Sequence, residues 1–323
     1  MPPSAAPASV YVLPPLPYTR LRFTLRATEP STLPPFKGSL LRGAFGHALR
    51  SVACAMGPEQ PCESCRLRAV CVYTRVFETY VEGEPPPFLR GLPEAPRPYV
   101  FEPGTEALTF APGAPLPFDL LLIGRAVEPL PYVLLAVERM AAAGLGSRRH
   151  PFALDRVDAQ TPDGWQPVFA DGRAQGRPLP PLVPSEDVPA DRARLRFLTP
   201  TRLKAQGQLL TGVDFRGLVF TMLRRILELA WFHVPDAEVD WTFRPLLERA
   251  STVKVRASDL VWKDWQRYSN RQQRSMTLGG FVGTLDLEGD LTPFGPLLRT
   301  AEVVHVGKGA TFGLGRMEIA PPG

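Results

Sequence analysis

The sequence predicts an α+β protein of two domains, each with the element order β-α-β-β-α-β. Its 323 residues are enough for about two domains with separate cores. Short segments that alternate apolar and polar residues are interleaved with segments of helical spacing. This order occurs once before and once after a proline-rich segment at 177–189, which has the composition of a linker.

The first half supplies the elements in this order. Residues 18–26 alternate with period two, and 37–52 place Leu41, Phe45, Ala48, Leu49 and Val52 on one face of a helix. Strands are expected near 99–101, 108–110 and 118–125, a helix over 131–143 and a strand over 152–159. The helix has Pro131 in its first turn and Gly144 after its end, as helices commonly do.

The second half repeats the pattern. A strand over 192–199 precedes a helix that Asp214 caps, with an apolar stripe from Phe215 to Ala230. Strands near 251–261 and 276–287, a short helix over 293–299 and a strand over 302–306 complete the set. Both halves are therefore predicted to be ferredoxin-like (RRM-like) units. The predicted domains are 1–185 and 186–323.

Composition limits the class of protein. The net charge of +5 and the pI near 9.2 permit a nucleic-acid partner without requiring one. The N-terminus has no basic start followed by an apolar core, so we expect no signal peptide. The most apolar segment, 218–234, is interrupted by Arg224, Arg225 and Glu228, so no membrane span is predicted. We expect a cytoplasmic protein.

All four cysteines lie within eighteen residues, in a loop inserted after the first predicted helix: Cys54, Cys62, Cys65 and Cys71. Four thiolates can close a tetrahedral structural zinc site, which is our first interpretation. An iron–sulfur cluster is the alternative, and four unligated thiols are the third. Neither metal interpretation leaves an open coordination position, so we expect no catalytic metal.

A glycine-rich stretch near the C-terminus contains Gly307, Gly309, Gly313 and Gly315, with Lys308 and Arg316 among them. We expect a strand, a loop and a second strand here. Spacing excludes the P-loop, because Lys308 is not followed by Ser or Thr, and the dinucleotide fingerprint, because Phe312 replaces its third glycine. Bare backbone suits contact with a polyanion, but glycines kept for tight packing are the competing interpretation.

The first predicted helix carries His47 on the face opposite its apolar residues. Glycine within a helix costs about 1 kcal/mol relative to alanine. Gly43 and Gly46 beside a histidine therefore suggest close approach by a bulky partner.

Two further segments combine features that grip RNA. Residues 262–274 interleave aromatic rings with basic side chains, among them Arg267, Arg271 and Arg274. The other interpretation is a solvated turn with two buried tryptophans. The loop 144–150 adds Arg148 and Arg149.

Four glycine-containing segments, 38–46, 144–146, 279–283 and 307–315, resemble those of CRISPR-associated precursor-RNA processing endoribonucleases of the RAMP superfamily. The resemblance spans nearly the whole chain. It implies two adjacent ferredoxin-like domains, with the glycine-rich loop against RNA. It also implies metal-independent cleavage of repeat RNA by a ribose 2′-hydroxyl, which leaves 5′-hydroxyl and 2′,3′-cyclic phosphate ends. The implied partners are repeat RNA, guide RNA and other CRISPR effector subunits.

Such enzymes often use a histidine on the first helix, and His47 occupies the matching place. We expect His47 to act as general base, with charge from Lys37, Arg42 or Arg50 near the phosphate. His305 is the second choice for chemistry. Two other classes remain open: a guide-RNA-binding subunit that does not cut, and an assembly protein that uses the cysteine loop as a protein contact.

Overall fold

We describe the protein from a computed structural model. It describes residues 11–321 except 58, 82–84, 86, 90–91, 93, 177–178, 206–207, 210–211 and 270–273. The strands are β1 (Tyr18–Ala27), β2 (Ser31–Thr32), β3 (Tyr99–Pro103), β4 (Thr109–Phe110), β5 (Pro115–Ile123), β6 (Phe152–Thr161), β7 (Gly164–Ala170), β8 (Arg173–Ala174), β9 (Arg192–Thr201), β10 (Lys204–Ala205), β11 (Gln208–Leu209), β12 (Lys254–Lys263), β13 (Gln266–Ser269), β14 (Arg274–Thr277), β15 (Gly280–Glu288) and β16 (Met317–Ala320). The helices are α1 (Gly38–Ala53), α2 (Val72–Val76), α3 (Leu130–Ala142), α4 (Phe215–His233), α5 (Arg244–Ala250) and α6 (Gly295–Val304), with 3-10 turns η1 (Arg68–Val70), η2 (Pro87–Leu89), η3 (Gly124–Val127), η4 (Thr292–Phe294) and η5 (Ala310–Phe312).

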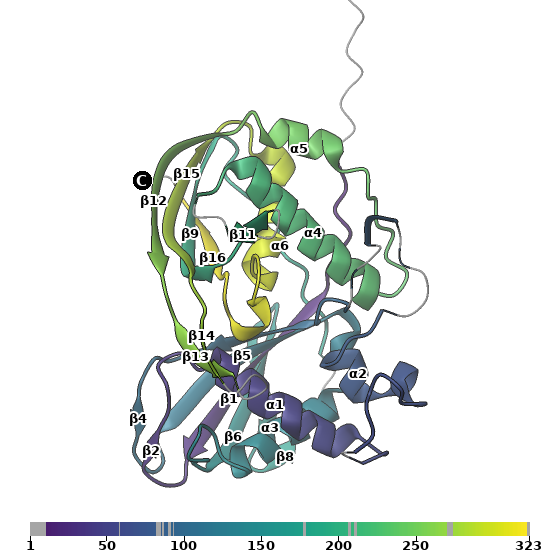
Figure 1. Cartoon of the computed structure of the whole chain (residues 1–323), viewed down its shortest axis with the longest axis vertical. Coiled ribbons are helices and arrows are strands. Elements are labelled where there is room, and N and C mark those ends of the chain that lie inside the picture. Colours follow the sequence, from purple (N-terminus) through teal and green to yellow (C-terminus); the bar gives the residue numbers. More distant parts are fainter. Residues whose placement is uncertain are drawn as a thin grey trace, which may run out of the picture.

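The same sheet order occurs in both halves of the molecule. The first sheet runs β3-β5-β1-β6-β7-β8 and the second β12-β15-β9-β16. In each, the first strand of the half lies between its third and fourth main strands, and all these pairings are antiparallel. The two sheets and their helices lie in adjacent parts of the molecule (Figure 1). The predicted α+β class with tandem ferredoxin-like domains is confirmed.

Each half has its own apolar core, because alternate residues of the strands face the helices. One core lies between Leu21 and Val168 and contains the inner residues of β1 with those of α1 and α3. The other lies between Ala193 and Met317 and contains the stripe of α4. Leu16 packs into the second core although it precedes β1, so the chain start spans both halves.

The end of the chain differs from the expectation. Residues 302–306 were predicted as a strand, but Glu302–Val304 form the last turn of α6. Leu297, Leu298, Ala301 and Val304 are buried at helical spacing, and this packing overrides the strand preference of Val303 and Val304. The fourth strand of the second domain is therefore β16, which follows the glycine-rich loop instead of preceding it.

The two halves are joined by close contacts around α4. The backbone of His233 lies so near Gly124 that a Cβ there would meet its carbonyl oxygen at 2.1 Å. The His233 ring is buried, with Nε2 2.5 Å from the carbonyl oxygen of Pro96, and burial lowers its pKa to about 4. His233 is thus a packing residue at the end of α4. Among the described residues, no helix is both long and apolar enough to cross a membrane.

Candidate RNA interface and active site

Helix α1 is fixed at its start by Lys37, one of the residues predicted to contact the scissile phosphate. The Lys37 side chain is fully buried, and its Nζ donates to the carbonyl oxygens of Pro34, Pro35 and Ala107 at 3.1, 3.3 and 2.7 Å. Burial lowers the pKa of its ammonium group. All three donors are used within the chain, so Lys37 is a structural residue and not a phosphate contact.

His47 lies on the solvent-facing side of α1. Of the four histidines, all of which the structure describes, it is the only exposed one. Its face of the helix also carries Gly43, which is four residues earlier and therefore about 40° away around the axis. A group on this face can reach an external substrate without any change of fold.

The two glycines beside His47 have different surroundings. A Cβ on Gly46 would meet the Phe77 ring at 2.1 Å, so this glycine is required by packing within the chain. A Cβ on Gly43 would have no atom within 4 Å. Packing within the chain therefore explains the glycine at position 46. Close approach by an external partner stays an interpretation only for the glycine at position 43.

Arg42 and Arg50 are both half-buried. The Arg42 guanidinium stacks on the rings of Phe77 and Phe312, at 4.6 and 5.2 Å from their centroids. Arg50 donates to the carbonyl oxygen of Gln60 at 2.9 Å, which ties the cysteine-containing segment to α1. Both arginines serve internal contacts, and of the two Arg50 is the one that lies a single helical turn from His47.

The glycine-rich loop 307–315 is held tightly between the two domains. Its glycines all have positive φ. A Cβ on Gly313 would meet the Phe101 carbonyl oxygen of β3 at 2.5 Å, and one on Gly315 would meet the Val306 carbonyl oxygen at 1.8 Å. These positions need glycine because of the left-handed backbone and the close approach of the chain itself. Intrachain packing thus accounts for glycine here, as the competing interpretation had it.

The same loop also contacts α1. A Cβ on Gly38 would lie 1.7 Å from the carbonyl oxygen of Phe312, so the first turn of α1 fits directly against the loop. At its other side the Thr199 hydroxyl donates to the Gly313 carbonyl oxygen and accepts from the Arg316 amide. The loop is therefore clamped between the first domain and the end of β9.

His305 precedes this loop and is buried, with 1% of its surface exposed. Its Nδ1 lies 3.1 Å from the Leu314 carbonyl oxygen and its Nε2 2.9 Å from Oε1 of Glu102 in β3. Glu102 also pairs with Arg20 of β1. A side chain enclosed in this way does not reach solvent, so His305 does not fit the catalytic role held open for it.

Lys308 and Arg316, the predicted phosphate contacts of the loop, differ in exposure. Lys308 is exposed, and its amide donates to the Arg202 carbonyl oxygen at 2.9 Å, which fixes its backbone. Arg316 is half-buried, and its charge contributes to lowering the pKa of Glu102. Lys308 is thus available to an external anion, whereas Arg316 faces the contact between the domains.

The segment with interleaved aromatic and basic residues forms a hairpin, β13–β14, that extends from the second domain toward α1 (Figure 1). At its base the Trp265 ring lies on the Phe36 ring with centroids 4.2 Å apart. Arg267 and Arg274 belong to its strands, and Arg271 lies outside the described residues. This hairpin and the glycine-rich loop both approach the start of α1.

A second basic segment, 144–150, lies on the other side of α1. Arg148 and Arg149 are exposed there, and a Cβ on Gly146 would lie 3.9 Å from the Leu40 side chain of α1. His150 is less accessible, with Nδ1 3.6 Å from a Glu29 carboxylate oxygen. Cationic groups therefore flank the exposed face of α1.

Basic residues on the outer faces of the two sheets are mostly neutralised by neighbouring acids. In β1, Arg22 pairs with Asp119 and Arg26 with Asp155. In β9, Arg194 pairs with Asp286. These strands carry less net positive charge than their sequences suggest, which leaves the surroundings of α1 as the better anion site.

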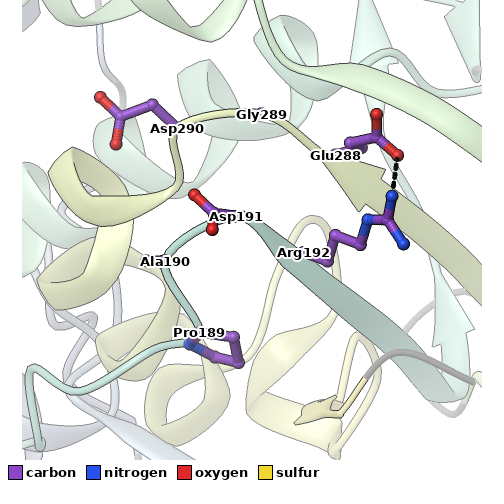
Figure 2. Close-up of a pocket in the computed structure, with 7 residues that line it drawn as sticks. All are labelled: Pro189, Ala190, Asp191, Arg192, Glu288, Gly289 and Asp290. Atoms are coloured by element: carbon purple, nitrogen blue, oxygen red, sulfur yellow. Dashed lines mark ion pairs between the residues drawn. The ribbon is translucent and has the colours of Figure 1, made fainter.

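A shallow surface depression lies at the far end of β9 from the glycine-rich loop (Figure 2). Asp191, Glu288 and Asp290 line it; Glu288 pairs with Arg192 at 3.2 Å and with Arg256 at 2.5 Å, and Asp290 pairs with Arg249 at 3.0 Å. The three carboxylates are matched by three arginines, so the depression offers no excess positive charge to a phosphate and is not a candidate RNA site.

Comparisons with known proteins agree with this arrangement. A family described as the AF_1859 N-terminal domain matches residues 16–181, half of the chain. The family model of the CRISPR-associated endoribonuclease Cas6 matches residues 195–317. The chain therefore has an AF_1859-type N-terminal half and a C-terminal part that matches the Cas6 family. Among proteins with curated functions, none matches it significantly.

Solved Cas6 structures share the fold at low sequence identity. A Cas6 product complex is 17% identical with a TM-score of 0.56, covering 94% of this chain and 100% of that one. Thermus thermophilus Cas6 is 16% identical with a TM-score of 0.52, covering 94% and 99%. A partial Cas6-RT-Cas1–Cas2 complex is 13% identical with a TM-score of 0.57, covering 96% and 47%. At such identities the similarity establishes the Cas6 fold alone.

The cysteine segment follows α1 directly. Cys54, Cys62, Cys65 and Cys71 are all half-buried free thiols. Burial raises the pKa of Cys62, and negative charge at Cys54 and Cys71 adds to the effect. Within the described residues, no three His, Cys, Asp or Glu side chains are arranged to hold a metal ion. The thiols are neighbours but do not form a ligand set in this structure, so zinc stays a prediction.

Several important residues of this candidate site were not found from the sequence. Glu102 contacts His305 and also pairs with Arg20. Phe36 contacts Trp265 at the base of the hairpin, and Phe312 contacts Arg42. They occur singly in strands or loops, without a motif. Only the tertiary fold brings them together.

Proposed function

We propose that this protein is a metal-independent endoribonuclease that binds and cleaves CRISPR repeat RNA. The observation that carries the proposal is the exposure of His47 on α1, on the same face as Leu40, beside which the loop with Arg148 and Arg149 lies. An exposed imidazole can take a proton at neutral pH, and nearby cations favour a polyanionic substrate.

In the proposed reaction, a His47 ring nitrogen takes the proton of a ribose 2′-hydroxyl. The 2′-oxygen attacks the adjacent phosphorus, the bond to the 5′-oxygen breaks, and the departing oxygen takes up a proton. The products carry a 2′,3′-cyclic phosphate and a 5′-hydroxyl. Arg42 and Arg50 supply charge from below the helix surface, and Lys308, Arg148 and Arg149 are proposed to contact the flanking phosphates.

The further proposed RNA contacts are the hairpin residues Arg267, Arg271 and Arg274 and the loop backbone at Gly307 and Gly309. Gly313, Gly315 and Arg316 face the packed side of the loop and are not proposed as contacts. Neighbouring structures are described as a Cas6 product complex and as a Cas6-RT-Cas1–Cas2 complex. By analogy, repeat RNA and other CRISPR proteins are the proposed partners. The cytoplasmic location stays a prediction.

We further propose a structural zinc ion at Cys54, Cys62, Cys65 and Cys71. Four thiolates in one short segment have the donor chemistry that zinc prefers, and no open position is left for catalysis. The ion would stabilise the segment that follows α1. An iron–sulfur cluster is the alternative ligand for the same thiols.

The experiment that tests the proposed function uses repeat RNA with a single 2′-deoxy nucleotide at the scissile position, beside the unmodified RNA, with and without chelator. We expect equal binding of both RNAs and cleavage of the unmodified one only. Its downstream product should accept a phosphate from polynucleotide kinase directly, because its 5′-end is a hydroxyl. Cleavage of the deoxy substrate would contradict the mechanism. Tight binding of both RNAs without cleavage would favour a guide-RNA-binding subunit.

A further inference from the structure

We propose that Gly43 is the point at which bound RNA contacts the backbone of α1, beside His47. This inference deepens the proposed function and rests on it. It assigns a substrate contact to a residue with no side chain, on the most exposed side of the helix.

The position of Gly43 has no explanation within the chain. Glycine weakens a helix relative to alanine, and a Cβ here would meet nothing within 4 Å. Its φ is not among the positive values, so the backbone would accept any residue. By contrast Gly46, three residues later, is required by the Phe77 ring at 2.1 Å. A glycine that weakens the helix and meets no packing requirement within the chain points to a requirement set by an external partner.

The surroundings identify the class of partner. Gly43 shares its face with His47, the exposed imidazole. On one side Arg42 stacks against Phe312 of the glycine-rich loop, and on the other the loop with Arg148 and Arg149 lies beside Leu40. A sugar–phosphate backbone fits this cationic setting, and a ribose seated against bare helix backbone would bring its 2′-hydroxyl close to the ring of His47.

The test compares the variants G43A and G43L with wild type for thermal stability, affinity for repeat RNA and single-turnover cleavage. G43A should raise Tm by about 2–4 °C, because the helix gains propensity without a clash. G43L should fold and yet bind RNA at least about tenfold more weakly or cleave it about 100-fold more slowly, since a shift of about 1 Å has effects of that size. G43A should show the same change to a smaller extent.

Two controls separate this contact from folding and from added bulk. G46A should lower Tm, because its Cβ would overlap Phe77. A142L adds the same side chain to an exposed position of α3 and should bind and cleave like wild type. If G43L also binds and cleaves like wild type, the proposal is overturned. If G43L is unstable, RNA binding and cleavage by G43A are compared with those of wild type instead. Unchanged binding and cleavage by G43A would then overturn the proposal.

The result is distinct from a failure of the proposed function. If H47A cleaves as well as wild type, the assignment of the base is wrong, whereas weak RNA binding by G43L would still support the contact. If H47A is inactive while both Gly43 variants behave like wild type, the proposed function stands and the Gly43 contact is excluded.

Discussion

Nε2 of His305 lies 2.9 Å from Oε1 of Glu102, and this buried contact joins the base of the glycine-rich loop to the first domain. Both nitrogens of the His305 ring face oxygen atoms, those of Leu314 and Glu102. His305 also has a positive φ of 62°, a conformation that costs about 1–3 kcal/mol for such a residue. The surrounding contacts hold it there and fix the loop next to α1.

The contact makes stability depend on pH at acidic values. Burial raises the pKa of Glu102, but the hydrogen bond and charge of His305 and the charge of Arg20 outweigh it and hold the pKa at about 2, below the ordinary 4.5. The stabilisation is fully present above pH 4.5 and is lost as pH falls toward 2. We expect wild type to lose about 3 kcal/mol over this range beyond what Glu102→Gln loses. Urea unfolding between pH 6 and 2.5 measures it, and parallel curves for both proteins would contradict it.

Removal of the Lys37 ammonium should destabilise the fold. Lys37→Met removes the charged donor that the carbonyl oxygens of Pro34, Pro35 and Ala107 share. Hydrogen bonds to charged groups contribute about 1.5–3 kcal/mol, so we expect a loss of at least about 2 kcal/mol in chemical denaturation. Lys308→Met, at an exposed position, should keep stability and weaken RNA binding. A Lys37→Met protein with unchanged stability and no cleavage would instead assign Lys37 to the chemistry.

The stacking of Phe36 on Trp265 should hold the hairpin β13–β14 against the first domain. Aromatic pairs contribute about 0.5–1.5 kcal/mol. In Phe36→Ala, amide hydrogen exchange of the hairpin strands, 266–269 and 274–277, should therefore be faster by up to about tenfold. Phe88→Ala removes an aromatic contact with Trp241 elsewhere and serves as the matched control. Equal exchange in the hairpin of all three proteins would show that the contact does not restrain it.

Metal analysis tests the cysteine segment. We expect about one zinc ion per chain in protein purified without chelator, and its removal should lower Tm. Replacement of Cys62 and Cys65 by serine should abolish binding of the metal while leaving some RNA affinity. A brown protein with iron and labile sulfide would favour the cluster, and a metal-free protein of unchanged stability would exclude both.

Sequence periodicity was enough to predict both ferredoxin-like domains, because each buries alternating strand residues and a helical stripe. It failed where short segments are ambiguous. Val303 and Val304 favour a strand by themselves, but Leu297 and Ala301 place them on a helix that packs in the core. The predicted strand before the glycine-rich loop was wrong for this reason.

The candidate site was predicted in part. The exposure of His47 followed from helical spacing. The burial of Lys37 and His305 did not follow from spacing, because the residues that they contact lie far away in sequence. Lys37 contacts Ala107, and His305 contacts Glu102. A basic or imidazole side chain in a motif can serve the fold as well as a substrate, and only burial and hydrogen bonds distinguish the two.

The most direct test of the account is single-turnover cleavage of repeat RNA by His47→Ala, with RNA affinity and Tm measured on the same protein. Because His47 is exposed, its loss should leave affinity and Tm nearly unchanged. General base catalysis contributes about 100- to 10,000-fold, so the cleavage rate should fall by at least about 100-fold. Cleavage at the wild-type rate by a folded His47→Ala protein would contradict the central claim.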